Sequence, residues 1–209
     1  MMTDMTMDNF LTVLSSSEPV PGGGGACGYV AAVGMSLGNM VLALTTGKKK
    51  YAEYQEEIEE LIVKATDLTK RLAECMDKDA ESFKPLAAAY GLPKDTEEQI
   101  KEREAIMAKA LVTASEAPLS MMELILEVMK LIDRISVIGS RIAISDAGVG
   151  ITMCEAAMKG ASLNVFINTK LMKDRELAED MNFKADKMLA EAAQIEEETF
   201  GRVMDAVRP

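Results

Sequence analysis

Residues 22–25 are four consecutive glycines, and they lead directly into nineteen positions, residues 26–44, that carry no charge. Glycine loses more conformational entropy on folding than any other residue, so such a run is typical of a turn that needs close backbone approach. The pattern predicts a loop that exposes backbone N–H groups, followed by a buried apolar helix over about residues 25–46. This junction is our first candidate for a ligand site, although a tight turn that only lets helices pack closely explains the same glycines.

Two phosphate-binding motifs resemble this junction but fail on their context. Gly23, Gly25 and Gly28 satisfy the spacing G-x-G-x-x-G, yet the preceding segment holds three serines and a proline where a dinucleotide loop requires a strand. A Walker loop fails because the Gly47-Lys48 pair is not followed by Ser or Thr. The sequence therefore predicts neither nucleotide site.

The apolar run is also long enough to span a bilayer. Gly28, Gly34 and Gly38 provide the small-residue spacing that lets helices pack closely in lipid or in a protein core, while Ser36 and Asn39 lower the hydropathy. No second run of this length follows, and no basic segment precedes it. We therefore expect a central helix buried on all sides and no membrane association.

Composition limits the chemistry. A chain of 209 residues fits one domain, residues 1–209, and contains no histidine, which removes the commonest metal ligand and the usual base at neutral pH. We therefore expect no metal, and proton transfer by a carboxylate, lysine, tyrosine or thiol. The three cysteines are odd in number and widely spaced, which suits a reducing compartment, so we expect the protein in the cytoplasm. Cys27 lies where a helix start would lower its pKa, but a Cys–His nucleophile is excluded.

A formal net charge of −11 argues against nucleic acid and anionic membrane surfaces as partners, because both require a positive face. An anionic ligand would have to be captured by a local basic cluster. Lys48, Lys49 and Lys50 form the densest one, and a solvated loop explains them equally.

Helical spacing dominates the chain, and no segment shows the sustained alternation of a half-buried strand. The predicted fold is an all-α, multi-helix, up-and-down bundle. Gly91 and Pro93 end a long acidic helix, Thr96 with Gln99 forms a capping box, and Pro118 divides the following segment into two helices. Besides the buried helix, the expected helices cover residues 7–14, 51–90, 96–117, 118–139, a segment capped by Ser145 or Asp146, and 173–207.

One carboxylate falls on the apolar side of the 51–90 helix. Steps of three and four residues place Asp79 on the same stripe as Leu72, Met76 and Phe83, whereas Asp77 falls on a charged face. A buried carboxylate must be paired, hydrogen-bonded or shifted in its pKa, so Asp79 is our candidate for acid–base catalysis. An ion pair or a helix-capping contact that fixes packing is the alternative.

Other polar residues allow two interpretations. Asn164 and Asn168 are four residues apart, so their amides either project into one pocket or bond neighbouring helices. Asp146 either binds a ligand or caps a helix. Lys94 and Arg103 are either anion contacts or ordinary surface residues.

Several stretches spread over residues 10–174 resemble the formiminotetrahydrofolate cyclodeaminase and methenyltetrahydrofolate cyclohydrolase family. They are Ser17-Glu18-Pro19-Val20-Pro21-Gly22-Gly23-Gly24, Leu44-Thr45 with Gly47-Lys48-Lys49, Asp79-Ala80 with Phe83, Leu92-Pro93-Lys94, Arg103, Pro118, Ser145-Asp146-Ala147-Gly148-Val149, and Asn164-Val165 with Asn168. Gly139-Ser140-Arg141 departs from the Gly-Asn pair that this family often carries.

The resemblance implies a helical homodimer that uses no metal and binds a tetrahydrofolate derivative near the glycines. Asp79 would shuttle the proton, and Lys48 with Lys94 would bind the glutamate tail. The remaining expected contacts are Pro21, Gly22, Gly23, Gly24, Gly25, Arg103, Asp146, Asn164 and Asn168. We expect cyclodeaminase activity, with cyclohydrolase activity second. A non-enzymatic oligomerisation protein and a metabolite-binding protein are the competing classes.

Overall fold

The computed structural model describes residues 2–209, which contain helices and no strand. The long helices are α2 (Gly23–Ala43), α3 (Gln55–Tyr90), α4 (Glu97–Ile138), α5 (Ile144–Thr169) and α6 (Arg175–Val207). A short helix, α1 (Met7–Leu14), precedes them, and three 3-10 turns, Met2–Asp4, Lys49–Tyr54 and Arg141–Ala143, complete the fold. The predicted all-α bundle is confirmed.

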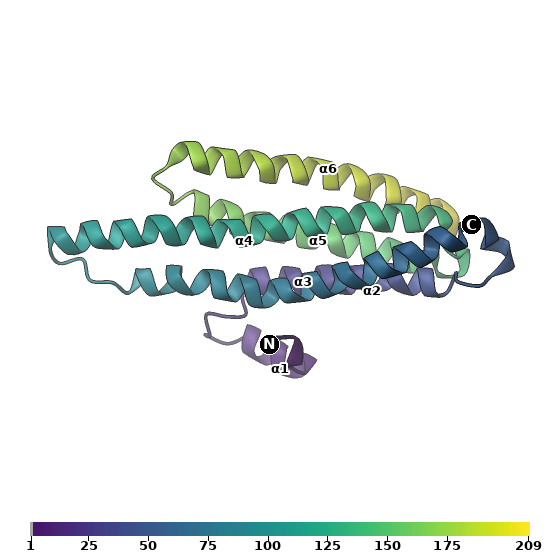
Figure 1. Ribbon diagram of the computed structural model, residues 1–209, viewed down its shortest axis with the longest axis horizontal. Helices are drawn as coiled ribbons and strands as arrows, with labels where there is room; N and C mark the ends of the chain where they lie inside the picture. Colours follow the sequence, from purple (N-terminus) through teal and green to yellow (C-terminus); the bar gives the residue numbers. More distant parts are fainter. Residues whose placement is uncertain (1) are drawn as a thin grey trace.

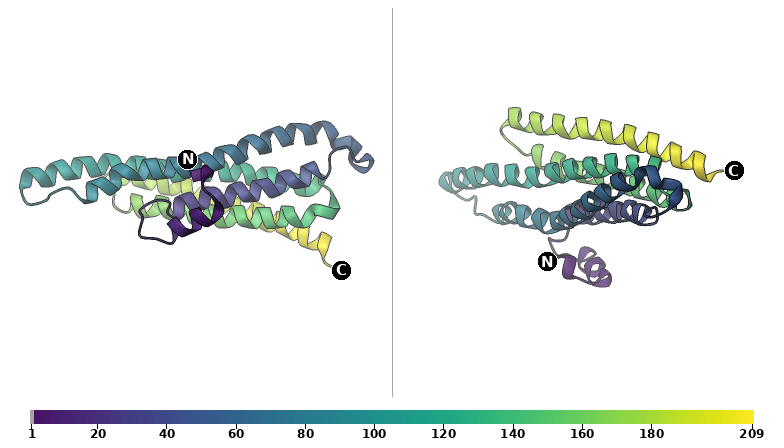
Figure 2. Two further views of the ribbon diagram at one scale, coloured as in Figure 1. Left: turned by 90° about the horizontal axis from the view of Figure 1, so that it is seen from below. Right: turned by 45° about the vertical axis from the view of Figure 1, so that its right-hand side comes forward.

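Helices α2, α3, α4 and α5 run alternately up and down and pack side by side, with α2 between α3 and α5. Helix α6 packs on α4 and α5, whereas α1 projects on the opposite side of the bundle (Figure 1). The turn between α2 and α3 lies at one end of the molecule, and the loop between α3 and α4 lies at the other. The right-hand view in Figure 2 shows α1 projecting from the packed helices.

The centre of the bundle depends on glycines where α2 crosses α5. A Cβ atom on Gly34 would lie 2.8 Å from the carbonyl oxygen of Gly150 and 2.7 Å from the Cys154 sulfur. A Cβ on Gly150 would lie 2.7 Å from the Gly34 oxygen. Two backbones therefore touch at this crossing, which only glycine at both positions permits.

Helix α2 is buried against its neighbours but not on all sides. Ala31, Met35, Val41 and Leu42 are fully buried, whereas Met40 is 41% exposed. By length and composition α2 could cross a membrane, but 44% of its apolar 18-residue window is buried inside the bundle. The expectation of complete burial is wrong, because one chain covers α2 on the sides of α3 and α5 and leaves an outer face open.

Pro118 does not end a helix, because α4 continues through it from Glu97 to Ile138. A proline inside a helix removes one N–H donor and leaves the carbonyl of residue i−4 without its usual partner. Here the side-chain amide of Asn168 donates to the Ala114 carbonyl at 2.9 Å. A residue of α5 thus satisfies the carbonyl that the proline freed.

Four other expected helix starts also shift. Helix α3 begins at Gln55, after the 3-10 turn Lys49–Tyr54, rather than at residue 51. Helix α2 begins at Gly23 rather than at residue 25, and α6 begins at Arg175 with Asp174 as its cap. Helix α5 starts at Ile144 after a 3-10 turn, and Ala143, its N-cap, makes no side-chain bond. Capping by Ser145 or Asp146 is therefore wrong, because both residues lie inside the first turn.

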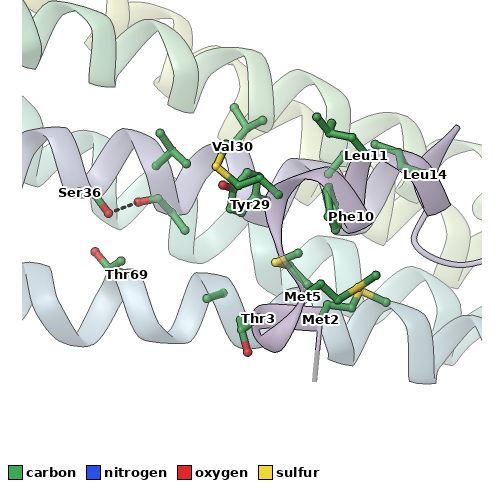
Figure 3. A pocket seen from close by; sticks show the side chains of 16 residues that line it. Met2, Thr3, Met5, Phe10, Leu11, Leu14, Tyr29, Val30, Ser36 and Thr69 are labelled. Carbon is green, nitrogen blue, oxygen red and sulfur yellow. Dashed lines mark hydrogen bonds between the residues drawn. The ribbon is translucent and has the colours of Figure 1, made fainter.

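The N-terminal segment covers an apolar cavity of about 480 Å³ against α2 and α3. Met2, Met5 and Phe10 enter it from the segment, and Tyr29 and Val30 from α2 (Figure 3). The Phe10 and Tyr29 rings are 5.5 Å apart. Side chains rather than close helix packing therefore connect α1 to the bundle.

Candidate active site

A second cavity, of about 350 Å³, lies where the glycine turn meets α3 and α5. Its volume is within the range of small-molecule sites. Asp79 lies on one wall, and Asn164 and Asn168 lie on another. The remaining lining residues are Pro19, Val20, Gly22, Gly23, Gly24, Phe83, Tyr90, Ala114 and Ile167.

Asp79 reaches this cavity because the 3.6-residue period of α3 turns its side chain inward, towards the start of α2. Its carboxylate accepts a hydrogen bond from the backbone N–H of Gly25, one of the amides that a helix start leaves unpaired. Burial raises the pKa of this carboxyl, and the Gly25 bond partly opposes that shift. The side chain therefore caps α2 and still presents a carboxylate primed to take up a proton.

The glycines allow this contact by lacking a side chain. A Cβ atom on Gly24 would coincide with the Asp79 carboxylate, whereas one on Gly23 would lie 3.9 Å from the nearest Asn164 atoms. Gly24 is thus required by the position of Asp79, while Gly23 is open towards the cavity. The close-packing interpretation of the glycine run therefore applies at Gly24, and the ligand-site interpretation stays a prediction that the cavity beside Gly23 permits.

The two asparagines are fixed by bonds within the protein. Asn164 donates to the Gly160 carbonyl at 3.0 Å. The Asn168 amide nitrogen donates to Ala114 and to the Asn164 carbonyl, both at 2.9 Å. Both of its N–H groups are therefore used, and its oxygen is the atom that it can offer to a ligand.

Not all predicted contacts line this cavity. Gly25 acts through its N–H bond to Asp79, while Pro21 lies behind the turn, next to Gly25. Arg103 lines a separate hollow with Leu92 and Pro93, beyond the end of α3, and the lining of the Asp79 cavity does not include Lys94.

Lys48 and Asp146 lie at the opposite end of the bundle. Lys48 follows the last turn of α2 and donates to the Ser140 hydroxyl at 3.0 Å, and Asp146 is in the first turn of α5. Helix α2 separates this end from the glycine turn by about 30 Å, at 1.5 Å per residue. One chain therefore does not bring Lys48 to Asp79.

Cys27 lies near the cavity but is not activated. Burial and the negative charge of Asp79 raise the pKa of the Cys27 thiol to about 11. The expectation that a helix start lowers this pKa is wrong, because desolvation and a nearby carboxylate both disfavour the thiolate. Among residues 2–209, no group of three or more Cys, Asp or Glu side chains is arranged to hold a metal ion, and the predicted absence of metal stays a prediction.

Five residues that were not predicted as contacts also line the cavity, namely Pro19, Val20, Tyr90, Ala114 and Ile167. Tyr90 follows Phe83 by seven residues on α3, so extending the stripe of Asp79 along the helix would have found it. Ile167 is offset by three residues from Asn164 on α5, and the same reasoning applies. Pro19 and Val20 lie in irregular backbone, where no periodicity signals a position.

Residues 6–187 match the family model described as formiminotransferase-cyclodeaminase. The chain belongs to this family. It is 38% identical over 202 residues to the methenyltetrahydrofolate cyclohydrolase of Methylorubrum extorquens, and the match covers 97% of each chain.

Two further proteins are less similar to this chain in sequence, and one of them is much longer. The formimidoyltransferase-cyclodeaminase of Mus musculus is 28% identical over 189 residues, which are 90% of this chain but 35% of that protein. The crystal structure of formiminotetrahydrofolate cyclodeaminase from Thermotoga maritima superposes with a TM-score of 0.81 at 23% identity, covering 99% of this chain and 98% of that one. The fold of the family is therefore that of the bundle described above.

Proposed function

We propose that this protein is a folate one-carbon enzyme in which Asp79 transfers protons at the carbon that bridges N5 and N10 of tetrahydrofolate. The observation that carries the proposal is the position of Asp79, a carboxylate with a raised pKa that faces a cavity formed by a glycine turn and aromatic side chains. A histidine-free chain needs such a group for proton transfer at neutral pH.

Cyclohydrolase is the leading reaction, because a methenyltetrahydrofolate cyclohydrolase is 38% identical over 97% of both chains. Water adds its oxygen to the methenyl carbon, and Asp79 accepts one of its protons. The carbonyl then forms as the carbon–N5 bond breaks, Asp79 returns its proton to N5, and the hydroxyl proton goes to solvent. Before the addition, the anionic Asp79 also stabilises the cationic methenyl group.

Cyclodeaminase is the second candidate, and the family model and the mouse relative favour it. In that reaction N10 attacks the carbon of the protonated formimino group, whose nitrogen becomes a neutral amino group. Asp79 then carries the N10 proton to this amino group, and ammonia leaves as the methenyl cation forms. The sequence alone placed this reaction first. The resemblance to the cyclohydrolase over the full chain reverses the order.

Replacing Asp79 with Asn tests the proposal. We expect turnover of methenyltetrahydrofolate, followed by its absorbance, to fall by about 1,000-fold, because an amide cannot carry the proton. Asp67, an exposed residue of the same helix that pairs with Arg71, provides the matched control, and Asp67→Asn should keep wild-type turnover. An Asp79→Asn variant within tenfold of wild type would contradict the role of Asp79.

The same assay with 5-formiminotetrahydrofolate distinguishes the two reactions. Ammonia release and growth of methenyl absorbance from the formimino substrate identify the deaminase. Loss of absorbance from methenyltetrahydrofolate, with no ammonia released from the formimino substrate, identifies the hydrolase. Failure of both substrates with folded wild-type protein would reject the proposed function.

We further propose a cytoplasmic homodimer that binds neither nucleic acid nor membranes. The net charge of −11 supports the absence of nucleic acid and of anionic lipid, and three free thiols suit a reducing compartment.

A further inference from the structure

The Asp79 cavity provides a proton-transfer group but no cation. Among residues 2–209, no lysine or arginine lines it. Folates end in the carboxylates of a glutamate tail, and a carboxylate ligand is normally held by a cation or by several N–H donors. Lys48, which we expected to hold the tail, lies about 30 Å away at the other end of α2. A tail contact within this chain therefore has to come from another residue.

An arginine with an unused donor lies beyond the cavity, in the hollow at the α3–α4 end of the bundle. The Arg103 Nε is one of three buried side-chain nitrogen or oxygen atoms in residues 2–209 that lack a hydrogen-bond partner. A buried N–H without an acceptor is unfavourable, so an anion here would supply a contact that the protein itself does not provide. The hollow has a volume of about 200 Å³ and is lined by Leu92, Pro93, Gln99, Glu102 and Arg103.

The Gln99 side chain has its amide oxygen fixed by the backbone. Its Oε1 accepts the N–H groups of Asp95 and Thr96, at 2.9 and 3.2 Å, as part of the capping box of α4. An amide whose oxygen is held in this way has only its N–H donors to offer elsewhere. The hollow therefore combines a guanidinium with an amide donor, and both groups bind carboxylates.

The hollow lies on the same sides of α3 and α4 as the Asp79 cavity. Tyr90 follows Asp79 by eleven residues on α3, and Ala114 follows Arg103 by eleven residues on α4. Eleven residues make almost three whole turns, so the members of each pair face nearly the same way and are about 16 Å apart. Since Ala114 lines the cavity, Arg103 lies on the cavity side of α4, nearer to the α3–α4 loop (Figure 1).

The length of a folate matches this spacing. At ordinary bond lengths, the benzoyl ring and glutamate place the tail carboxylates about 10–13 Å beyond N10. Arg103 lies about 16 Å beyond Ala114 along α4, and its long side chain shortens the remaining gap. Phe83 and Tyr90, which line the cavity on the side of α3, provide aromatic faces for the benzoyl ring.

We propose that the hollow is the tail subsite, in which Arg103 and Gln99 bind a carboxylate of the glutamate tail while the reacting carbon lies at Asp79. This inference rests on the proposed function. The substrate then follows one path along α3 and α4, from Asp79 past Tyr90 to Arg103. The exposed Glu102 lines the same hollow, and its negative charge opposes a bound carboxylate.

Replacing Arg103 with Gln tests the subsite, because the change removes the charge and keeps a long polar side chain. KM for methenyltetrahydrofolate should rise by about tenfold with little change in kcat, since the tail contact exists in the ground state as well as in the transition state. Arg71→Gln is the control, because Arg71 is an exposed residue of α3 that pairs with Asp67, and this variant should keep the wild-type KM. An Arg103→Gln variant with wild-type KM would overturn the inference.

A substrate without the tail gives a readout that a merely structural role of Arg103 would not reproduce. In methenyltetrahydropteroyl methylamide, a neutral methyl group replaces the glutamate on the amide nitrogen. For the wild-type protein its KM should be about tenfold higher than that of methenyltetrahydrofolate, and Arg103→Gln should not raise it further. An equal increase for both substrates would overturn the inference. Failure of the wild-type protein to turn over either substrate would instead reject the proposed function.

Gln99→Glu separates the subsite from the helix cap. Glutamate also completes a capping box with Thr96, so the free energy of unfolding should stay at the wild-type value. The new side chain brings a negative charge to the place of the amide donors. KM for methenyltetrahydrofolate should therefore rise by about tenfold, whereas KM for the methylamide should not change. Wild-type KM values for both substrates would contradict the role of Gln99.

Two neighbouring charges sharpen the assignment. Glu102→Gln removes the opposing charge and should lower KM for methenyltetrahydrofolate by about two- to threefold, a gain that damage to the fold would not produce. Lys94→Gln should leave KM near the wild-type value, because Lys94 does not line the hollow. If Lys94→Gln raises KM more than Arg103→Gln does, the loop lysine holds the tail and the assignment to Arg103 is overturned.

Discussion

The two ends of helix α2 contain different kinds of structure. At the glycine end, a carboxylate from α3 accepts a backbone N–H bond beside a cavity, and burial raises the pKa of that carboxyl. At the other end, the buried Thr45 hydroxyl accepts the Ser140 N–H at 2.8 Å, and Lys48 binds the Ser140 side chain. At the glycine end, burial makes the ionised form of Asp79 unfavourable, which suits a group that takes up a proton. At the other end the polar groups are hydrogen-bonded, and these bonds fix a turn of the chain.

A single helix thus positions a candidate catalytic group at one end and fixes a turn of the chain at the other. Substitutions at the glycine end should therefore change turnover more than stability. Substitutions at the Thr45 end should first change the free energy of unfolding.

Gly24, which approaches the Asp79 carboxylate, should be the most sensitive position for activity. Gly24→Ala places a methyl group on the Asp79 carboxylate and should reduce kcat by about 100-fold, because small misplacements of a catalytic group are costly. Gly201→Ala is the control, since a Cβ on this residue of α6 meets nothing within 4 Å, and kcat should stay within a few-fold of wild type. Equal kcat values for the two variants would mean that the position of Asp79 does not limit catalysis.

A second effect concerns the wall of the same cavity. Asn168→Ala leaves the Ala114 carbonyl without a donor and should destabilise the protein by about 1–3 kcal/mol in urea unfolding. In a Pro118→Ala background the new N–H can bond Ala114, so the same substitution should cost less. Additive losses in this double-mutant cycle would refute the link between the proline and the asparagine.

The Thr45 end provides the third comparison. Thr45→Val keeps the shape of the side chain but leaves the buried Ser140 N–H without its acceptor. We expect a loss of about 1–2 kcal/mol in the free energy of unfolding, measured by urea titration. Thr66→Val, on the exposed surface of α3, is the control and should change stability by less than about 0.5 kcal/mol. A Thr45→Val variant as stable as the control would remove the contrast between the two ends.

The smallest effect is a gain in stability at the glycine end. The folded-state pKa of Asp79 lies above its unfolded value, so ionisation opposes folding, and stability is lost as pH rises through the interval between the two values. Asp79→Asn removes this cost and should be more stable than wild type by about 1 kcal/mol at neutral pH. The advantage should shrink at acidic pH, where wild-type Asp79 is protonated, and a difference that does not depend on pH would contradict the raised pKa.

Much of this architecture was predictable from the sequence because it depends on local signals. The inward direction of Asp79 follows from the helical period, and the end of α3 follows from Gly91, whereas its start does not lie at the expected residue 51. The bounds of α1 are those predicted. The capping box of Thr96 and Gln99 is formed as predicted.

The errors arose where a distant residue decides the local structure. Pro118 predicts a helix break until Asn168, fifty residues later, supplies the missing donor. The Cys27 pKa depends on Asp79 from another helix. The distance between Lys48 and the glycines could have been calculated from the rise of one helix. The resemblance to a family hid this distance, because it groups residues without saying which chain provides them.

The bond between Asn168 and Ala114 also has a consequence for the history of the family. A lineage that exchanges the proline of α4 for a residue with an N–H removes the requirement for an amide at position 168, whereas a lineage that keeps the proline retains that requirement. Aligned homologues should therefore vary at positions 118 and 168 as a correlated pair, although the two residues lie on different helices.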